Sequence, residues 1–146
     1  MRAWIVAAFL LVAPAAIAKE EGQPVNPVGY FEIPVTDLDR AAAFYQAAFG
    51  HVLARERIDG YDMALFPVDR DGAGASGALV KGDVYIPAKA GPILYFSVDS
   101  IDRTIERAAK AGGKTLYPRK AIGDLGFVAE IEDSEGNRIA LHEAAD

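Results

Sequence analysis

The sequence predicts an α+β domain made of two tandem βαβββ modules whose mixed sheets enclose a groove. Two observations lead to this prediction: one segment recurs along the chain, and the same order of strand-like and helix-like segments accompanies each copy. A composition of 51% hydrophobic and 10% aromatic residues supplies enough apolar material for a core in a chain of 146 residues. We expect a single folded domain over residues 28–146.

The two copies of the recurring segment lie 63 positions apart. Residues 35–40, Val-Thr-Asp-Leu-Asp-Arg, align with residues 98–103, Val-Asp-Ser-Ile-Asp-Arg, and the same displacement places Gly50 on Gly113. Because the alignment needs no gap, it indicates duplication of one folding unit with an unbroken register.

Module one, residues 28–82, begins with a strand and a helix. Residues 28–35 are β-branched and aromatic, which is typical of a strand. Asp37 then offers a side-chain oxygen to cap a helix, apolar residues follow at helical spacing, and Gly50 ends the helix. Three further strands are expected at residues 51–58, 61–68 and 75–81.

Module two, residues 91–143, repeats this order. A strand over residues 93–98 precedes a helix that begins after Ser100 and ends at Gly112 and Gly113. Each helix is expected to cover one face of its sheet, so the other faces of the two sheets are expected to meet around a ligand groove. The remaining strands are expected at residues 114–122, 126–132 and 137–143.

The beginning of the chain has a different character. A basic start, an apolar run and small residues at Ala16 and Ala18 are typical of a signal peptide over residues 1–18, so we expect cleavage after Ala18 and export to the periplasm or the medium. A membrane anchor is the alternative, but the segment contains Pro14 and is shorter than the roughly 20 apolar residues of a spanning helix. No stable membrane anchor is expected after cleavage, and residues 19–27 are expected to form an extended lead-in.

Charge and composition exclude several classes of function. With 15 basic and 21 acidic side chains, the net charge is −6 at pH 7, which provides no basic face for a phosphate backbone. Nucleic acid is therefore not an expected partner. The absence of cysteine excludes disulfides, thiolate nucleophiles, iron–sulfur clusters and thiolate zinc sites. A small-molecule ligand is the expected partner.

The segments that open both modules are similar to those of a known superfamily. Residues 30–40, Tyr-Phe-Glu-Ile-Pro-Val-Thr-Asp-Leu-Asp-Arg, resemble the opening of the vicinal oxygen chelate superfamily, and residues 132–139 resemble part of its second module. That superfamily includes glyoxalase I, extradiol dioxygenases, and bleomycin and fosfomycin resistance proteins. The resemblance covers about residues 28–143 and implies the glyoxalase/bleomycin resistance-like fold.

Metal-dependent members of that superfamily place His, Glu or Gln at four strand positions in the groove. The resemblance carries these positions over to Tyr30, Gly77, Ile93 and Ala140, and the repeat supports the assignment because each pair is 63 positions apart. None of the four is an ordinary ligand of a divalent metal. We therefore expect no metal site of the standard kind and no cofactor.

Strand side chains alternate, so residues two positions further along are expected on the same groove face. Glu32 and His142 are the candidate catalytic residues, because a carboxylate beside an imidazole can act as acid and base. The plainer interpretation is an ion pair for Glu32 and a solvent-exposed ring for His142. The candidate ligand-binding residues are Tyr30, Leu79, Ile93 and Tyr95.

Three functional interpretations follow. In the first, the chain binds a small organic molecule in the groove without the standard metal, as antibiotic-sequestering members of the superfamily do. In the second, it is a glyoxalase-like lyase or isomerase that uses Glu32 and His142 as acid and base, or as a non-standard metal site. In the third, side chains fill the groove and the domain is structural. Because superfamily members commonly pair, the groove belongs either to one chain or to a homodimer.

Overall fold

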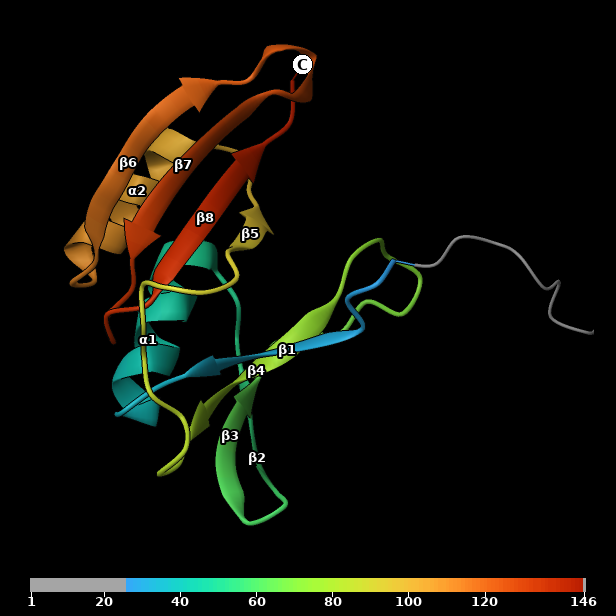
Figure 1. The fold of residues 1–146 in the computed structure, drawn as a ribbon, viewed down its shortest axis with the longest axis vertical. Coiled ribbons are helices and arrows are strands. Elements are labelled where there is room, and N and C mark those ends of the chain that lie inside the picture. Colours follow the sequence, from blue (N-terminus) through green and yellow to red (C-terminus); the bar gives the residue numbers. More distant parts are fainter. Residues whose placement is uncertain (1–25, 146) are drawn as a thin grey trace, which may run out of the picture.

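The structure is a computed structural model that describes residues 26–145, and Figure 1 shows how its helices and sheets are arranged. The expected signal peptide, residues 1–18, lies outside the described residues, as do residues 19–25 of the lead-in. A strand, a helix and three strands occur twice in succession, which confirms the α+β fold of two βαβββ modules. In the part of the chain that is described, no helix is both long and apolar enough to cross a bilayer.

Module one forms the first sheet and its helix. The strands are β1 (Tyr30–Pro34), β2 (Ala54–Ile58), β3 (Tyr61–Leu65) and β4 (Ser76–Lys81), and the helix is α1 (Leu38–Phe49). The strand order is β1-β4-β3-β2, with β1 parallel to β4 and the other pairs antiparallel. Asp37 caps α1 by accepting hydrogen bonds from the amides of Asp39 and Arg40. Gly50 ends α1 at φ 78°, a left-handed conformation that glycine adopts without steric cost.

Module two forms the second sheet with the same connections. Its elements are β5 (Leu94–Ser97), α2 (Ile101–Lys110), β6 (Lys114–Ala121), the short 3₁₀ helix η1 (Gly123–Leu125), β7 (Phe127–Glu132) and β8 (Arg138–Glu143). The strand order is β5-β8-β7-β6. The Ser100 side chain caps α2, and the first amide of the helix, at Ile101, donates a 2.7 Å hydrogen bond to Glu143.

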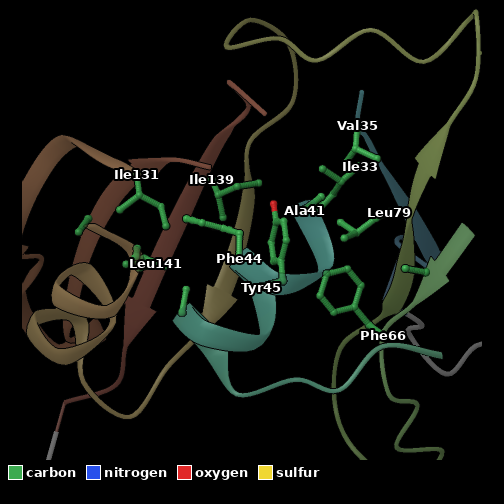
Figure 2. Close-up of a cluster of buried hydrophobic side chains, with 14 of the residues drawn as sticks. Ile33, Val35, Ala41, Phe44, Tyr45, Phe66, Leu79, Ile131, Ile139 and Leu141 are labelled. Carbon is green, nitrogen blue, oxygen red and sulfur yellow. The ribbon is translucent and has the colours of Figure 1, made fainter. Parts of the chain in front are cut away.

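Helix α1 lies between the two sheets, and both modules share one hydrophobic core (Figures 1 and 2). Phe44 and Tyr45 project from α1 into this core, with Leu79 of the first sheet on one side and Ile131 and Leu141 of the second sheet on the other. The helix-covered faces of both sheets therefore point into the shared core. The opposite faces, called outer faces below, point away from the core and do not face each other within one chain. Of the two arrangements expected for the groove, a groove between these faces therefore requires a second chain.

The repeat of 63 positions does not extend to the last strand of each module. Glu32 and Tyr95, which are 63 positions apart, pair with Ala78 and Ala140, which are 62 positions apart. The expectation of an unbroken register is wrong by one residue. Because side chains alternate along a strand, this slip places Leu79 on the face opposite Glu32.

The turn between β7 and β8 fastens module two onto module one. Asp133, only 3% exposed, accepts a 2.8 Å hydrogen bond from the Tyr45 hydroxyl, whose pKa is raised by burial and by this carboxylate. Asn137 donates a 2.8 Å hydrogen bond to the carbonyl oxygen of Pro34 and accepts a 3.0 Å hydrogen bond from the amide of Ala88. The turn thereby contacts α1, β1 and residues 83–90, called the link between the modules below.

Glu135 in the same turn adds a charged contact to α1. Its side chain has no solvent exposure, and its Oε1 accepts hydrogen bonds from the amides of Thr36 at 3.0 Å and Asp37 at 2.9 Å. Arg40 Nε donates a 2.7 Å hydrogen bond to Oε2. Burial raises the pKa of Glu135, but these hydrogen bonds outweigh it and lower the pKa to about 2. The carboxylate therefore stays charged in the folded protein at neutral pH.

Candidate functional site

A cavity of about 430 Å³ lies at the seam between the modules and is called the seam cavity below. Strand β1 lines it with Tyr30 and Glu32, and strands β5 and β8 line it with Leu94 and Arg138. The link between the modules contributes Ile86 and further apolar residues. Ligand pockets span about 300–1,000 Å³, so the volume suits a small organic molecule.

Two charged side chains line the seam cavity, and they differ in their partners. Arg138 forms a two-point ion pair with Glu130, with Nε 2.8 Å from Oε2 and Nη2 2.7 Å from Oε1. Glu32 accepts a 2.7 Å hydrogen bond from the hydroxyl of Tyr85, and within residues 26–145 it forms no ion pair. The positive charge at the cavity is therefore neutralised, whereas the negative charge is not.

Tyrosines lie beside Glu32 because the link folds over the outer face of the first sheet. Tyr85 of the link packs with Tyr61 of β3 on the apolar surface of β3 and β4, with the two rings edge to face and their centroids 5.1 Å apart. The hydrogen bond to Glu32 raises the pKa of Tyr85 to about 12. Burial and the charge of Glu32 raise the pKa of Tyr30. Both hydroxyls are therefore protonated at neutral pH and can donate hydrogen bonds.

Gly82 permits this packing of the link. A Cβ atom at Gly82 would lie 2.5 Å from the ring of Tyr61 and 3.2 Å from the ring of Tyr85, so a larger residue would displace the aromatic pair.

The structure does not gather the four predicted ligand-binding residues in the seam cavity. Tyr30 lines the cavity, together with the candidate catalytic residue Glu32, whereas Ile93 is not among the lining residues. Tyr95 lies on the outer face of the second sheet, where it is 56% exposed. The assignment of Leu79 to a ligand site is wrong, because β4 pairs Glu32 with Ala78 and leaves Leu79 fully buried in the shared core. Leu79 pairs with Ile33 of β1, which is also buried, so both side chains lie on the core face of the sheet.

Glu32 and His142 are not brought together in the chain. His142 lies on β8, where it pairs with Ser97, and its Nε2 is 2.7 Å from the carbonyl oxygen of Leu125 in η1. Glu32 lies on β1 of the other sheet and contacts Tyr85. The two candidate catalytic groups thus lie on separate sheets, and each has its own partner, Tyr85 of the link for Glu32 and Leu125 of η1 for His142.

The four positions carried over from the metal-dependent members do not fit a divalent metal. Gly77 has no side chain, and a Cβ atom there would lie 2.0 Å from the carbonyl oxygen of Phe31. Ile93 and Ala140 carry no donor atom, which leaves the hydroxyl of Tyr30 alone. Among the described residues, no three His, Cys, Asp or Glu side chains gather closely enough to hold an ion.

Two residues of the site carry no clear signal in the sequence. Tyr85 stands in the link, and its contact with Glu32 depends on how the link folds over β1. Arg138 reaches the seam cavity only because the β7–β8 turn is fastened to module one. The sequence does place Arg138 at the start of a strand, beside a turn, but that position alone does not indicate which residues lie near it.

Comparison with known proteins shows the family. The family model for the Glyoxalase/Bleomycin resistance protein/Dioxygenase superfamily matches residues 28–141. A glyoxylase-like domain-containing protein from Didymella fabae is 35% identical over 114 residues, covering 75% of this chain and 88% of that protein. The structure of a glyoxylase/bleomycin resistance protein/dioxygenase domain from Frankia sp. EAN1pec superposes with a TM-score of 0.65 at 23% identity, covering 84% of this chain and all of that one.

Other solved structures share the fold. TnmS3, an antibiotic binding protein from Streptomyces sp. CB03234, superposes with a TM-score of 0.61 at 22% identity, covering 84% of this chain and 99% of that one. The chain spans only 46% of a glyoxalase I variant from Zea mays, with a TM-score of 0.59. Because the family model spans both modules and the fold agrees, this chain belongs to the glyoxalase/bleomycin resistance/dioxygenase superfamily, the vicinal oxygen chelate superfamily.

Proposed function

We propose that this protein binds a small organic molecule in the seam cavity, without a divalent metal of the family's standard kind. The observation that carries the proposal is the cavity itself, which both modules line with mostly apolar residues and a few polar groups. That combination is typical of small-molecule sites, where apolar walls supply affinity and polar groups fix orientation. TnmS3, an antibiotic binding protein whose structure superposes on this chain, supports the proposal.

An NMR titration of the full chain with small aromatic compounds tests this proposal. We expect saturable amide shifts that gather around the cavity, at residues such as Tyr30 and Leu94. The variant Ala90→Trp should abolish these shifts, because Ala90 lines the cavity and an indole there would occupy it. The control Ala47→Trp, at an exposed position of α1, should preserve them. Scattered shifts, or binding that survives in Ala90→Trp, would contradict the proposal.

We also propose that the protein is exported after cleavage near Ala18. The support is the basic start, apolar run and small residues of residues 1–18. The intact mass of protein recovered from the periplasm or medium should correspond to a chain that begins at Lys19. A recovered chain that still begins at Met1 would contradict export by this route.

We further propose that two chains pair through the outer faces of their second sheets. Tyr95 and Tyr117 are 56% and 38% exposed on the outer face of the second sheet, so aromatic surface there is uncovered in one chain. Sedimentation equilibrium should give the mass of a dimer, and Tyr95→Glu should shift it toward a monomer. A monomer at every soluble concentration would contradict the pairing.

A further inference from the structure

The basic side chains around the seam cavity have ion-pair partners, whereas the carboxylate of Glu32 has none among the described residues. Arg138 lines the cavity and is paired with Glu130, and Lys89 of the link, between two cavity-lining alanines, is paired with Glu132. From the part of the chain that the structure describes, Glu32 receives one hydrogen bond, donated by the neutral hydroxyl of Tyr85. A carboxylate has about four acceptor sites, so most of those on Glu32 are open to a further donor.

An aromatic surface adjoins this carboxylate. Tyr30 lines the same cavity two residues before Glu32 on β1, and its side chain is 51% exposed. A positively charged nitrogen is attracted both to a carboxylate and to the face of a tyrosine ring. The protein's net charge of −6 also favours the approach of cations over anions.

We propose that the ligand of the seam cavity is an organic cation. It has an apolar ring system and a protonated amine, and Glu32 and Tyr30 bind the amine. This inference rests on the proposed function, because it assigns the charge of the molecule in that same cavity. An anionic ligand would meet the unpaired carboxylate of Glu32 and a guanidinium that Glu130 already neutralises. A neutral ligand would remove water from Glu32 without replacing its hydrogen bonds.

Three probes that share one ring system test the charge of the ligand. 1-Naphthylmethylamine is a cation at pH 7, 1-naphthylmethanol is neutral, and 1-naphthoate is an anion. We expect calorimetric titration of the full chain to give the amine an affinity about tenfold or more above that of the alcohol, since charge-assisted hydrogen bonds are among the stronger ones. The naphthoate should bind most weakly.

Substitution of Glu32 identifies the group responsible. Glu32→Gln keeps the shape of the side chain but removes its charge, so the affinity of the amine should fall until it no longer exceeds that of the alcohol. The alcohol should bind this variant at least as tightly as it binds the wild type, because a neutral amide loses less than a carboxylate when water is removed. The alcohol affinity in this variant also reports that the cavity is still folded. The control Glu56→Gln removes an exposed carboxylate from β2 of the same sheet, outside the seam cavity, and should change neither affinity.

The outcomes separate this inference from the proposed function. Equal affinities for all three probes would leave the cavity as a binding site and overturn the cationic ligand. Tighter binding of the naphthoate would also overturn it and would point to Arg138 as the anchor. An amine preference that survives in Glu32→Gln would overturn the role of Glu32. Absence of binding for all three probes would overturn both the cationic ligand and the proposed site.

Discussion

Replacing Glu135 by Gln tests how the two modules are held together. In the folded protein, the Glu135 carboxylate accepts hydrogen bonds from the amides of Thr36 and Asp37 and from Arg40 Nε. Glutamine can keep one oxygen toward the two amides, but its NH₂ group then faces the Nε–H of Arg40. Two hydrogen-bond donors, the amide NH₂ of the glutamine and the Nε–H of Arg40, then face each other, and the ion pair is lost.

The pKa of Glu135 indicates the size of the effect. A fall from 4.5 to about 2 corresponds to about 3 kcal/mol of folding stability at neutral pH, at about 1.36 kcal/mol per pKa unit. The Arg40 side chain is 53% exposed, so water screens part of the interaction, and we expect a loss of about 1–2 kcal/mol. For a domain of this size, that loss lowers Tm by about 3–10 °C.

The pH dependence of the loss identifies the charge as its cause. The pKa of Glu135 is lower in the folded than in the unfolded chain, so its contribution is complete well above pH 4.5 and is lost as the pH falls toward about 2. Urea unfolding followed by far-UV circular dichroism should therefore show a gap between the wild type and Glu135→Gln at pH 7 that narrows by more than half at pH 3. No gap at pH 7, or the same gap at pH 3, would refute the reasoning.

Glu106→Gln is the matched control for this prediction. Glu106 is an exposed carboxylate of α2 whose ion-pair partner is Lys110 on the same helix. Because exposed pairs of this kind contribute little, the urea midpoint at pH 7 should be almost unchanged.

Three further predictions concern the core and the site. Tyr45→Phe keeps the ring but removes the donor to buried Asp133, so urea unfolding should show a loss of about 1–2 kcal/mol. Leu79→Ala removes a fully buried side chain and should cost about 2–5 kcal/mol in the same assay, while the folded variant binds 1-naphthylmethylamine as the wild type does. Glu32→Gln should lower the pKa of Tyr85 from about 12 toward 10.0, measured by NMR titration of the tyrosine rings, because the hydrogen bond to the carboxylate becomes a weaker one to a neutral amide and the negative charge is removed.

Exposed residues of the same types provide the controls. Tyr117→Phe and Leu116→Ala alter side chains that are 38% and 39% exposed, and both should change the free energy of unfolding much less than their buried counterparts. Comparable losses in the exposed and buried variants would show that burial in the shared core is not the cause. In the NMR titration, a Tyr85 pKa that is the same in Glu32→Gln as in the wild type would show that Tyr85 and Glu32 are not in contact in solution.

The local elements of this protein follow from its sequence. Asp37 and Ser100 accept hydrogen bonds from amides in the first turns of α1 and α2, and alternating apolar residues form the strands around them. These features depend on neighbours within about four residues, so the sequence is sufficient to predict them. The placement of Tyr30 and Glu32 on one face of β1 follows in the same way.

The register of the last strand of each module, β4 and β8, could not be predicted from the sequence. The left-handed glycine that ends α1 is Gly50, and its structural counterpart after α2 is Gly112. Gly113 follows directly and aligned with Gly50 without a gap, but its φ is not positive, and a Cβ there would lie 2.8 Å from the carbonyl oxygen of Glu132. The two adjacent glycines therefore made the helix ends align at 63 positions, although the structurally equivalent glycines, Gly50 and Gly112, are 62 positions apart.

The sequence by itself determined the elements, their order and the residues that share a strand face. The tertiary structure alone decided which sheet faces meet. Packing α1 between the sheets buries apolar side chains from both modules in one core, and this turns the outer faces away from each other and separates Glu32 from His142. The same packing folds the link over β1, which brings Tyr85 to Glu32 and forms the seam cavity from residues far apart in the chain. Periodicity specifies which face of an element is apolar, but many partners could cover that face, and the choice among them is made by the packing of the whole chain.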